Sequence, residues 1–282
     1  MTSAGQDQAR KDCARLEASE EPGYLDHRGE QLYYVLHPAL GAPRAAVLLA
    51  GPFASERPHR YIPWVRWART LAREGFCALR FDYRGVGEST GRFEDLGFAD
   101  WHDDVCAATR WLGQRVPEVP LVLHGLGLGA LLATRAFDDG IGDALLSWLA
   151  PVSARAMLYD QLKLRLVSDM ALKLDRKGRD QYLAAIEAGQ TIEVEGYGWT
   201  RRLLEHADAF AITPGAASDP RRPCHAPVLD KVSAHVFGGV GPNPERDASG
   251  GKPMRLVNPN LSALFDQNIA WLREATSPRS TS

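Results

Sequence analysis

A turn with glycines at alternate positions carries the strongest chemical signal in the chain. Residues 121–130 read Leu-Val-Leu-His-Gly-Leu-Gly-Leu-Gly-Ala, so an apolar strand runs into a sharp turn and then into a helix. This order matches the G-x-S-x-G turn, which exposes a nucleophilic serine between two glycines. Gly125 and Gly129 occupy the flanking positions, but the central residue is Gly127. Glycine has no hydroxyl group that could attack a carbonyl or hold an acyl group, so the turn predicts the geometry of a nucleophile without the nucleophile.

The groups that would activate a serine are also missing from their expected places. A catalytic triad needs a carboxylate and a histidine, and both are expected late in this chain. Glu245 and Asp247 follow the expected strand Val232–Phe237, but no histidine follows His235, which falls inside that strand. Other residues that flank the expected pocket or lie in its neighbourhood could replace the serine chemistry. These candidates are, in order, His124, Glu56, His206 and His235, with Asp247 as the acid.

Backbone N–H groups that could stabilise an oxyanion are expected at two places. The segment 50–54 reads Ala-Gly-Pro-Phe-Ala and follows an apolar strand. Pro52 has no N–H, so Phe53 or Ala54 would have to donate. Leu128, which follows the central glycine of the turn, would donate from the other side. Phe53, Ala54 and Leu128 are therefore the expected donors of an oxyanion hole.

The same glycine turn also satisfies a pattern of nucleotide-binding proteins. Gly125, Gly127 and Ala130 fit the G-x-G-x-x-G/A fingerprint of dinucleotide-binding folds. The following strand ends with Ser-Trp-Leu-Ala at 147–150, however, and has no acid to bind a ribose hydroxyl. Dinucleotide binding is therefore kept as the weaker alternative, and no cofactor is expected.

Composition limits the classes of protein that fit. The 282 residues are 45% hydrophobic, with 33 basic and 35 acidic residues and a net charge of -2, so neither nucleic acid nor an anionic membrane is an expected partner. The longest apolar runs have the length of strands and could not span a membrane. The four cysteines are scattered and form no CxxC pair, so no metal site is expected. Residues 1–23 are polar, and a cytoplasmic location is expected.

Strand-like and helical patterns alternate along the first half of the chain. The expected strands are Gln31–His37, Ala45–Ala50, Phe76–Phe81, Leu121–His124 and Leu145–Ala150, and the expected helices are Pro63–Glu74, Phe98–Leu112 and Ala130–Phe137. This alternation predicts an α/β fold with a mostly parallel sheet covered by helices on both faces. Asp103 and Asp104 lie early in one of these helices, where acids favour the positive helix end.

The alternation then breaks, which predicts an insertion. A mainly helical cap is expected over 154–210, and a loop rich in Pro, Asp and Arg then leads to strands Val232–Phe237 and Pro253–Val257 and to a helix at Leu261–Arg273. The expected organisation is a flexible lead-in over 1–23, a core formed by 24–153 and 211–276, the cap, and a tail over 277–282.

A second glycine-rich loop carries a family resemblance. Residues 82–89 read Asp-Tyr-Arg-Gly-Val-Gly-Glu-Ser directly after a strand and resemble the DxRGxGxS loop of the α/β hydrolases, in which the acid and the arginine brace the loop. The chain is most similar to the hydrolase-like, serine aminopeptidase-like proteins associated with exosortase systems. The segments that carry this similarity are 51–56, 85–93, 101–112, 125–130 and 193–197.

The resemblance implies an α/β-hydrolase core with a small cap, and it implies that a glycine at the elbow is a feature of a subfamily. We therefore expect a pseudoenzyme that binds a small acyl- or ester-like molecule, or a partner protein, without serine-type hydrolysis. The alternative is an active hydrolase or acyl-transfer enzyme with a non-standard catalytic group.

Overall fold

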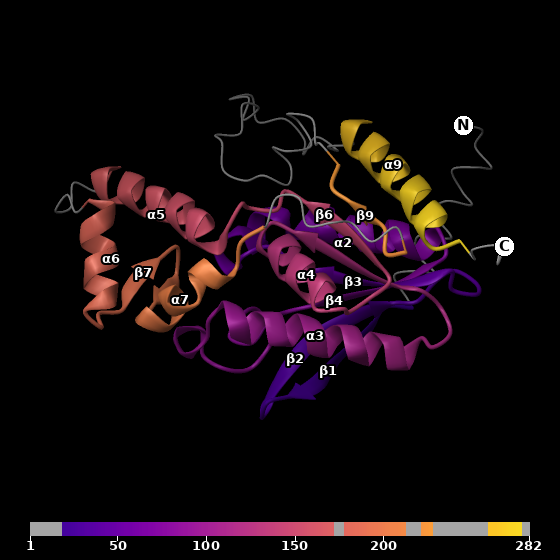
Figure 1. Cartoon of the computed structure of the whole chain (residues 1–282), viewed down its shortest axis with the longest axis horizontal. Helices are drawn as coiled ribbons and strands as arrows, with labels where there is room; N and C mark the ends of the chain where they lie inside the picture. The colour runs from indigo at the N-terminus through magenta and orange to yellow at the C-terminus, as the bar shows by residue number, and fades with distance from the viewer. Residues whose placement is uncertain (1–18, 172–177, 213–220, 228–258, 278–282) are drawn as a thin grey trace, which may run out of the picture.

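A computed structural model describes residues 19–171, 178–212, 221–227 and 259–277 (Figure 1). Within them, a seven-stranded sheet has the strand order β1-β2-β4-β3-β5-β6-β9. The strands are β1 (Glu21–His27), β2 (Glu30–His37), β3 (Ala45–Ala50), β4 (Phe76–Phe81), β5 (Leu121–Leu126), β6 (Ala144–Trp148) and β9 (Cys224–His225).

The sheet is antiparallel at one edge and parallel everywhere else. β1 pairs antiparallel with β2, and β2 with β4, whereas the pairs from β4 through β3, β5 and β6 to β9 are parallel. The carboxyl ends of the parallel strands therefore meet at one edge, which is where open α/β sheets bind ligands. The predicted fold class, an α/β-hydrolase fold with a mostly parallel sheet, is confirmed.

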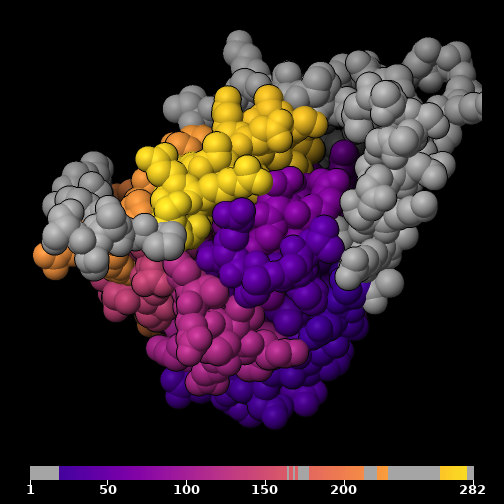
Figure 2. All heavy atoms as spheres, turned by 90° about the vertical axis from the view of Figure 1, so that its right-hand side faces the viewer, coloured from indigo at the N-terminus to yellow at the C-terminus, as the bar shows by residue number. Residues whose placement is uncertain are grey.

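Successive side chains of a strand point to opposite faces of the sheet, so a strand contributes to two hydrophobic cores. In β3, Ala46, Leu48 and Ala50 pack into one core, and the intervening residues pack into the other. The first core lies beneath α3 (Phe98–Arg115) and α4 (Leu128–Asp138), and the second beneath α2 (Arg57–Arg73) and α9 (Pro259–Ala275). In the space-filling view, α9 in yellow lies directly on the indigo and purple part of the chain (Figure 2). Helices thus cover both faces of the sheet, as predicted.

Residues 154–210, predicted to form a cap, consist of helices and a two-stranded sheet that project from one end of the main sheet (Figure 1). They are α5 (Ala154–Ala171), α6 (Arg179–Glu187), β7 (Ile192–Val194), β8 (Tyr197–Trp199), α7 (Arg201–Glu205) and the 3-10 helix η3 (Ala207–Ala209). Two backbone hydrogen bonds join the chain where it leaves the core and where it returns. Ala154 donates to the Phe210 carbonyl at 2.8 Å, and Ile212 donates to the Val152 carbonyl at 3.0 Å.

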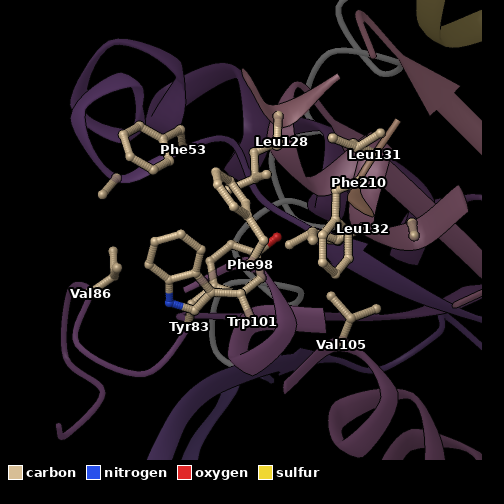
Figure 3. Close-up of a cluster of buried hydrophobic side chains, with 14 of the residues drawn as sticks. Phe53, Tyr83, Val86, Phe98, Trp101, Val105, Leu128, Leu131, Leu132 and Phe210 are labelled. Atoms are coloured by element: carbon tan, nitrogen blue, oxygen red, sulfur yellow. The ribbon is translucent and has the colours of Figure 1, made fainter. Parts of the chain in front are cut away.

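An aromatic cluster joins the cap to the core (Figure 3). The ring of Phe53, at the end of β3, makes edge contacts with Trp101 of α3 and with Trp199 of the cap, at centroid distances of 5.9 and 6.2 Å. Phe210, at the base of the cap, lies 6.0 Å from the ring of Phe98. The cap is therefore packed against the segment that follows β3, beside the elbow.

The structure differs from the sequence prediction in three places. Helix α2 begins at Arg57 rather than at Pro63, which lies inside it. Proline is favoured in the first turn, and Pro58 occupies that place, while the packing of Trp64 and Trp67 keeps the helix intact around Pro63.

The other two differences concern strands. β1 was not predicted: it begins at Glu21, inside the expected lead-in, and pairs along its whole length with β2. β9 lies in a segment expected to be a loop, and it pairs with Leu145 and Leu146 of β6. The expected strands Val232–Phe237 and Pro253–Val257 lie outside the described residues.

Candidate functional site

The elbow between β5 and α4 has the predicted backbone geometry. Gly127 has φ 59° and ψ −120°, a conformation that side-chain-bearing residues adopt only with strain. Its N–H donates to the Trp148 carbonyl at 2.9 Å, and its carbonyl accepts a hydrogen bond from the Ala130 N–H at 3.0 Å. The turn therefore places residue 127 at the start of α4, at the carboxyl edge of the sheet.

The two flanking glycines are required by packing. A Cβ atom on Gly125 would lie 2.3 Å from the Ala130 Cα atom, and one on Gly129 would lie 2.0 Å from the Ala50 carbonyl oxygen. Because both residues lack a side chain, α4 can lie close to β3 and β5 without these clashes. Because they account for Gly125 and Gly129, the glycine pattern does not require a bound dinucleotide.

An ion pair occupies the space into which a side chain on residue 127 would project. A Cβ atom on Gly127 would lie 2.8 Å from Nη1 of Arg60 and 3.3 Å from Oε2 of Glu56. Arg60 is 4% exposed, and its Nη2 donates to Oε1 of Glu56 at 3.0 Å. A buried guanidinium and a carboxylate thus fill the space into which a serine side chain would project.

The Glu56 carboxylate also engages the cap and the expected oxyanion hole. Gln161 of α5 donates from Nε2 to Oε1 of Glu56 at 3.2 Å, and its own Oε1 accepts a hydrogen bond from Ser55 Oγ at 2.9 Å. Burial raises the pKa of Glu56, and the Arg60 charge and a hydrogen bond from the Phe53 backbone oppose this rise. Of the three expected oxyanion donors, Phe53 therefore already serves the protein's own carboxylate. Ala54 is buried at the start of the 3-10 helix η1 (Ala54–Glu56).

A cleft of about 250 Å³ opens beside this ion pair. It is lined by Glu56, Arg60, Gly127, Leu128, Leu149, Pro151, Met157, Asp160 and Gln161, so core and cap both contribute. Behind Arg60 lies a smaller cavity of about 30 Å³ whose walls include Arg57, Arg80 and Asp82. The side chain of Arg60 separates the two spaces.

His124, the first candidate for a substitute catalytic group, does not reach the cleft. Alternation along β5 turns its ring into the second core, where it packs against Trp64, Trp67 and Trp148. Its Nδ1 lies 2.8 Å from the Leu146 carbonyl, which makes Nδ1 the protonated nitrogen, and its Nε2 has no partner among the described residues. Burial lowers the pKa of His124 to about 3, so the ring is neutral.

This buried histidine predicts a pH-dependent stability. The pKa in the folded state lies below the unfolded value, so unfolding takes up a proton as the pH falls from about 6.5 towards 3. Between pH 7 and pH 5, we expect the free energy of unfolding of the wild type to fall by about 2 kcal/mol more than that of His124→Phe. Urea unfolding at the two pH values measures this difference. An equal loss in both proteins would mean that His124 is not buried in the neutral form.

The other candidates do not form a triad among the described residues. His206, at the end of α7, is half-buried and does not line the cleft. His235 and Asp247 lie outside the described residues. Of the candidate catalytic groups that the structure describes, Glu56 alone lines the cleft at the elbow, and Leu128 from the oxyanion set lines it too.

Asp82 and Arg84 brace the glycine-rich loop at 82–89, as expected, and each has its own partner outside the loop. Asp82 accepts a hydrogen bond from the Glu88 N–H at 3.1 Å within the loop and two from Nε and Nη2 of Arg57, at 3.1 and 2.7 Å. Arg84 donates from Nε to Asp104 of α3 at 2.6 Å. Asp104 was expected to favour the positive end of this helix, but it is a fully buried counter-ion, and Asp100 instead accepts a hydrogen bond from the helix-capping N–H of Gly97.

Sequence reasoning missed Arg60 and Gln161. The spacing of Glu56 and Arg60, four residues apart, is a signal for a helical ion pair, although such pairs are usually exposed. Gln161 carries no local signal, because its contact with Glu56 joins residues 105 positions apart. Among the described residues, no group of three potential metal ligands is found.

Comparisons with known proteins agree with this architecture. A family model described as serine aminopeptidase matches residues 42–175, which include the elbow. Alpha/beta hydrolase domain-containing protein 10 from mouse is 16% identical and covers 90% of this chain and 99% of that chain, with a TM-score of 0.54. The Pyrococcus furiosus esterase Pf2001 is 15% identical and covers 94% of each chain, also with a TM-score of 0.54.

An alpha-beta serine hydrolase homologue from Coxiella burnetii is 16% identical and covers 89% of this chain and 97% of that chain, with a TM-score of 0.50. The chain spans 62% of the length of XC6422 from Xanthomonas campestris, at 24% identity and a TM-score of 0.43. No curated protein matches the sequence. The three matches with TM-scores of 0.50 to 0.54 show the α/β-hydrolase fold. No helix in the described part of the chain is long and apolar enough to cross a membrane.

Proposed function

We propose that this protein is a non-hydrolytic member of the α/β-hydrolase superfamily that binds a small acyl- or ester-like molecule in the cleft beside Gly127. The observation that carries the proposal is the Glu56–Arg60 pair in the place of the nucleophile. An ester carbonyl at this position would meet the Arg60 guanidinium, and residue 127 carries no side chain that could attack it.

The segment 154–210 acts as a cap in this proposal. Met157 and Gln161 of α5 form part of the cleft wall, so a ligand would contact core and cap together. We also propose that the chain is related to the exosortase-associated proteins that its sequence resembles. A cytoplasmic location belongs to the same proposal, and the free thiols of Cys77, Cys106 and Cys224 support it.

A second candidate function rests on Glu56. Its Oε2 atom lies 3.3 Å from the position of a Cβ on Gly127, and burial raises its pKa, as is common for general bases. In this alternative, Glu56 removes a proton from a water molecule that attacks the bound ester.

Restoring the serine tests the proposed function. We expect Gly127→Ser to leave hydrolysis of short p-nitrophenyl esters and thioesters at the level of the buffer, because no histidine in the described part of the chain lies at the cleft to activate the hydroxyl group. The positive φ and the contact with Arg60 should also lower the free energy of unfolding by about 1–3 kcal/mol. Initial rates and urea unfolding measure the two effects.

Gly127→Ala is the matched control, because it adds the same Cβ atom without a hydroxyl group. The two variants should lose similar stability and show the same lack of turnover. Turnover by the wild type that is abolished in Glu56→Gln would establish the second candidate function. Turnover that appears only in Gly127→Ser would show that an activating base lies within reach of residue 127.

A further inference from the structure

Two nitrogens of the Arg60 guanidinium lack hydrogen-bond acceptors. Arg60 is 4% exposed, and its Nε and Nη1 atoms have no partner among the described residues, whereas Nη2 is paired with Glu56. Buried polar groups are satisfied in most proteins, and an unpaired N–H of a charged group is especially costly. The guanidinium can therefore donate hydrogen bonds to a further acceptor.

The unpaired Nη1 atom is directed at the elbow. It lies 2.8 Å from the position of a Cβ on Gly127, and Arg60 and Gly127 both line the cleft. The first turn of α4, an 11-residue helix, begins at Leu128, and Gly127 supplies no side-chain cap for its N–H groups. Helix N-termini favour anions, so the unpaired guanidinium and the helix end favour the same kind of ligand atom.

The charged side chains around the small cavity also carry more positive than negative charge. Three guanidinium groups, those of Arg57, Arg60 and Arg80, line the small cavity behind the elbow. Two carboxylates face them: Asp82 pairs with Arg57, and Glu56 pairs with Arg60.

Arg80 is not neutralised by its own partner. Its Nε donates to Nε2 of His37, which is neutral because burial, together with the nearby charge of Arg80, lowers its pKa to about 3. Asp160, at the exposed rim of the cleft, has Lys163 as its own counter-ion. The small cavity, which shares Arg60 with the cleft, is thus lined by one more positive than negative charge among these groups.

The rest of the cleft is suited to a short apolar tail. Leu128, Leu149, Pro151 and Met157 contribute apolar walls, and the volume of about 250 Å³ lies just below the range of drug-sized ligand sites, which suits a smaller ligand. We propose that the cleft binds a small monocarboxylate, whose carboxylate group accepts hydrogen bonds from Arg60 and from the first turn of α4. Its apolar tail lies against Leu149, Pro151 and Met157. This inference rests on the proposed non-hydrolytic function, and it names the class of ligand.

Isothermal titration calorimetry with three probes of equal chain length tests the ligand class. Hexanoate should bind at least about tenfold more tightly than hexanamide or hexanol, because only the acid provides a charged acceptor for Arg60. Acetate should bind more weakly than hexanoate, because it has no tail to bury. Equal binding of hexanoate and hexanamide would overturn the inference, and so would a lack of hexanoate binding.

Two variants locate the site. Arg60→Met should abolish the preference for hexanoate over hexanamide. Since this variant alters a buried pair and could fail to fold, Met157→Trp serves as a second variant: it leaves the ion pair in place, fills the apolar end of the cleft and should weaken hexanoate binding at least about tenfold. Met170→Trp is the matched control, because Met170 lies on the same helix and is 59% exposed. It should bind hexanoate like the wild type.

Unchanged affinity in Met157→Trp would place hexanoate elsewhere and overturn the inference. Binding of hexanoate and hydrolysis of esters test different proposals, because ester hydrolysis by the wild type would contradict the non-hydrolytic function whatever the ligand. Hexanoate selectivity together with ester turnover would retain the site and overturn the non-hydrolytic function. No hexanoate binding and no turnover would overturn the ligand class alone.

Discussion

Gly129→Ala should lower the free energy of unfolding by about 4 kcal/mol or more, so that little folded protein remains. The added Cβ would lie 2.0 Å from the Ala50 carbonyl oxygen and 2.4 Å from both the Ala50 carbonyl carbon and the Gly51 carbonyl oxygen. All three atoms belong to the backbone at the end of β3, which is paired on both sides and cannot move without breaking the sheet. Urea unfolding monitored by circular dichroism measures the loss.

Gly113→Ala is the matched control for this substitution. Gly113 lies inside α3, where a Cβ would meet only the Cδ2 atom of Leu121, at an ordinary contact distance of 3.4 Å. Alanine is the better helix former, so this variant should be up to about 1 kcal/mol more stable than the wild type. A loss below about 2 kcal/mol in Gly129→Ala would mean that α4 does not approach β3 as closely as the structure shows.

Glu56→Gln should cost about 3–5 kcal/mol of stability at pH 7. The substitution preserves the shape of the side chain but removes the negative charge that faces the Arg60 guanidinium at 3.0 Å. The Arg60 side chain is only 5% exposed, so water cannot solvate the unpaired guanidinium. A buried charge that has lost its partner is far less stable than either the intact pair or a neutral replacement of both groups.

The double variant Glu56→Gln/Arg60→Met separates the loss of charge balance from the loss of packing. It should be more stable than Glu56→Gln alone, because it leaves no unpaired ion in the site. Chemical unfolding of the wild type, both single variants and the double variant closes the mutant cycle. Strictly additive losses would show that the two side chains do not interact, and would remove the main support for the proposed function.

The chain's local patterns were enough to predict the five adjacent strands β2, β4, β3, β5 and β6 and the elbow, but not the edge strands β1 and β9. Ala45–Ala50 and Phe76–Phe81 are strands with the predicted bounds, because short, continuously apolar segments suit a sheet covered on both faces. The glycines at 125 and 129 indicated a tight strand-to-helix turn, and Gly127 indicated the missing nucleophile. These features depend on residues that are close in sequence, so periodicity and residue type reveal them.

Only the tertiary structure decided what lies beside Gly127. His124 is adjacent to the elbow in sequence, but the alternation of side chains in β5 and the packing of α2 and α9 place it in a core of tryptophans. The pattern of α2 does not single out Arg60 as a core residue, and it is buried because the first turn of α2 lies beside Gly127 at the elbow. Gln161 reaches Glu56 only because the cap folds back over the elbow. Local patterns do not encode contacts between distant segments, which depend on how layers pack and which charges they enclose, so the composition of the site required the folded chain.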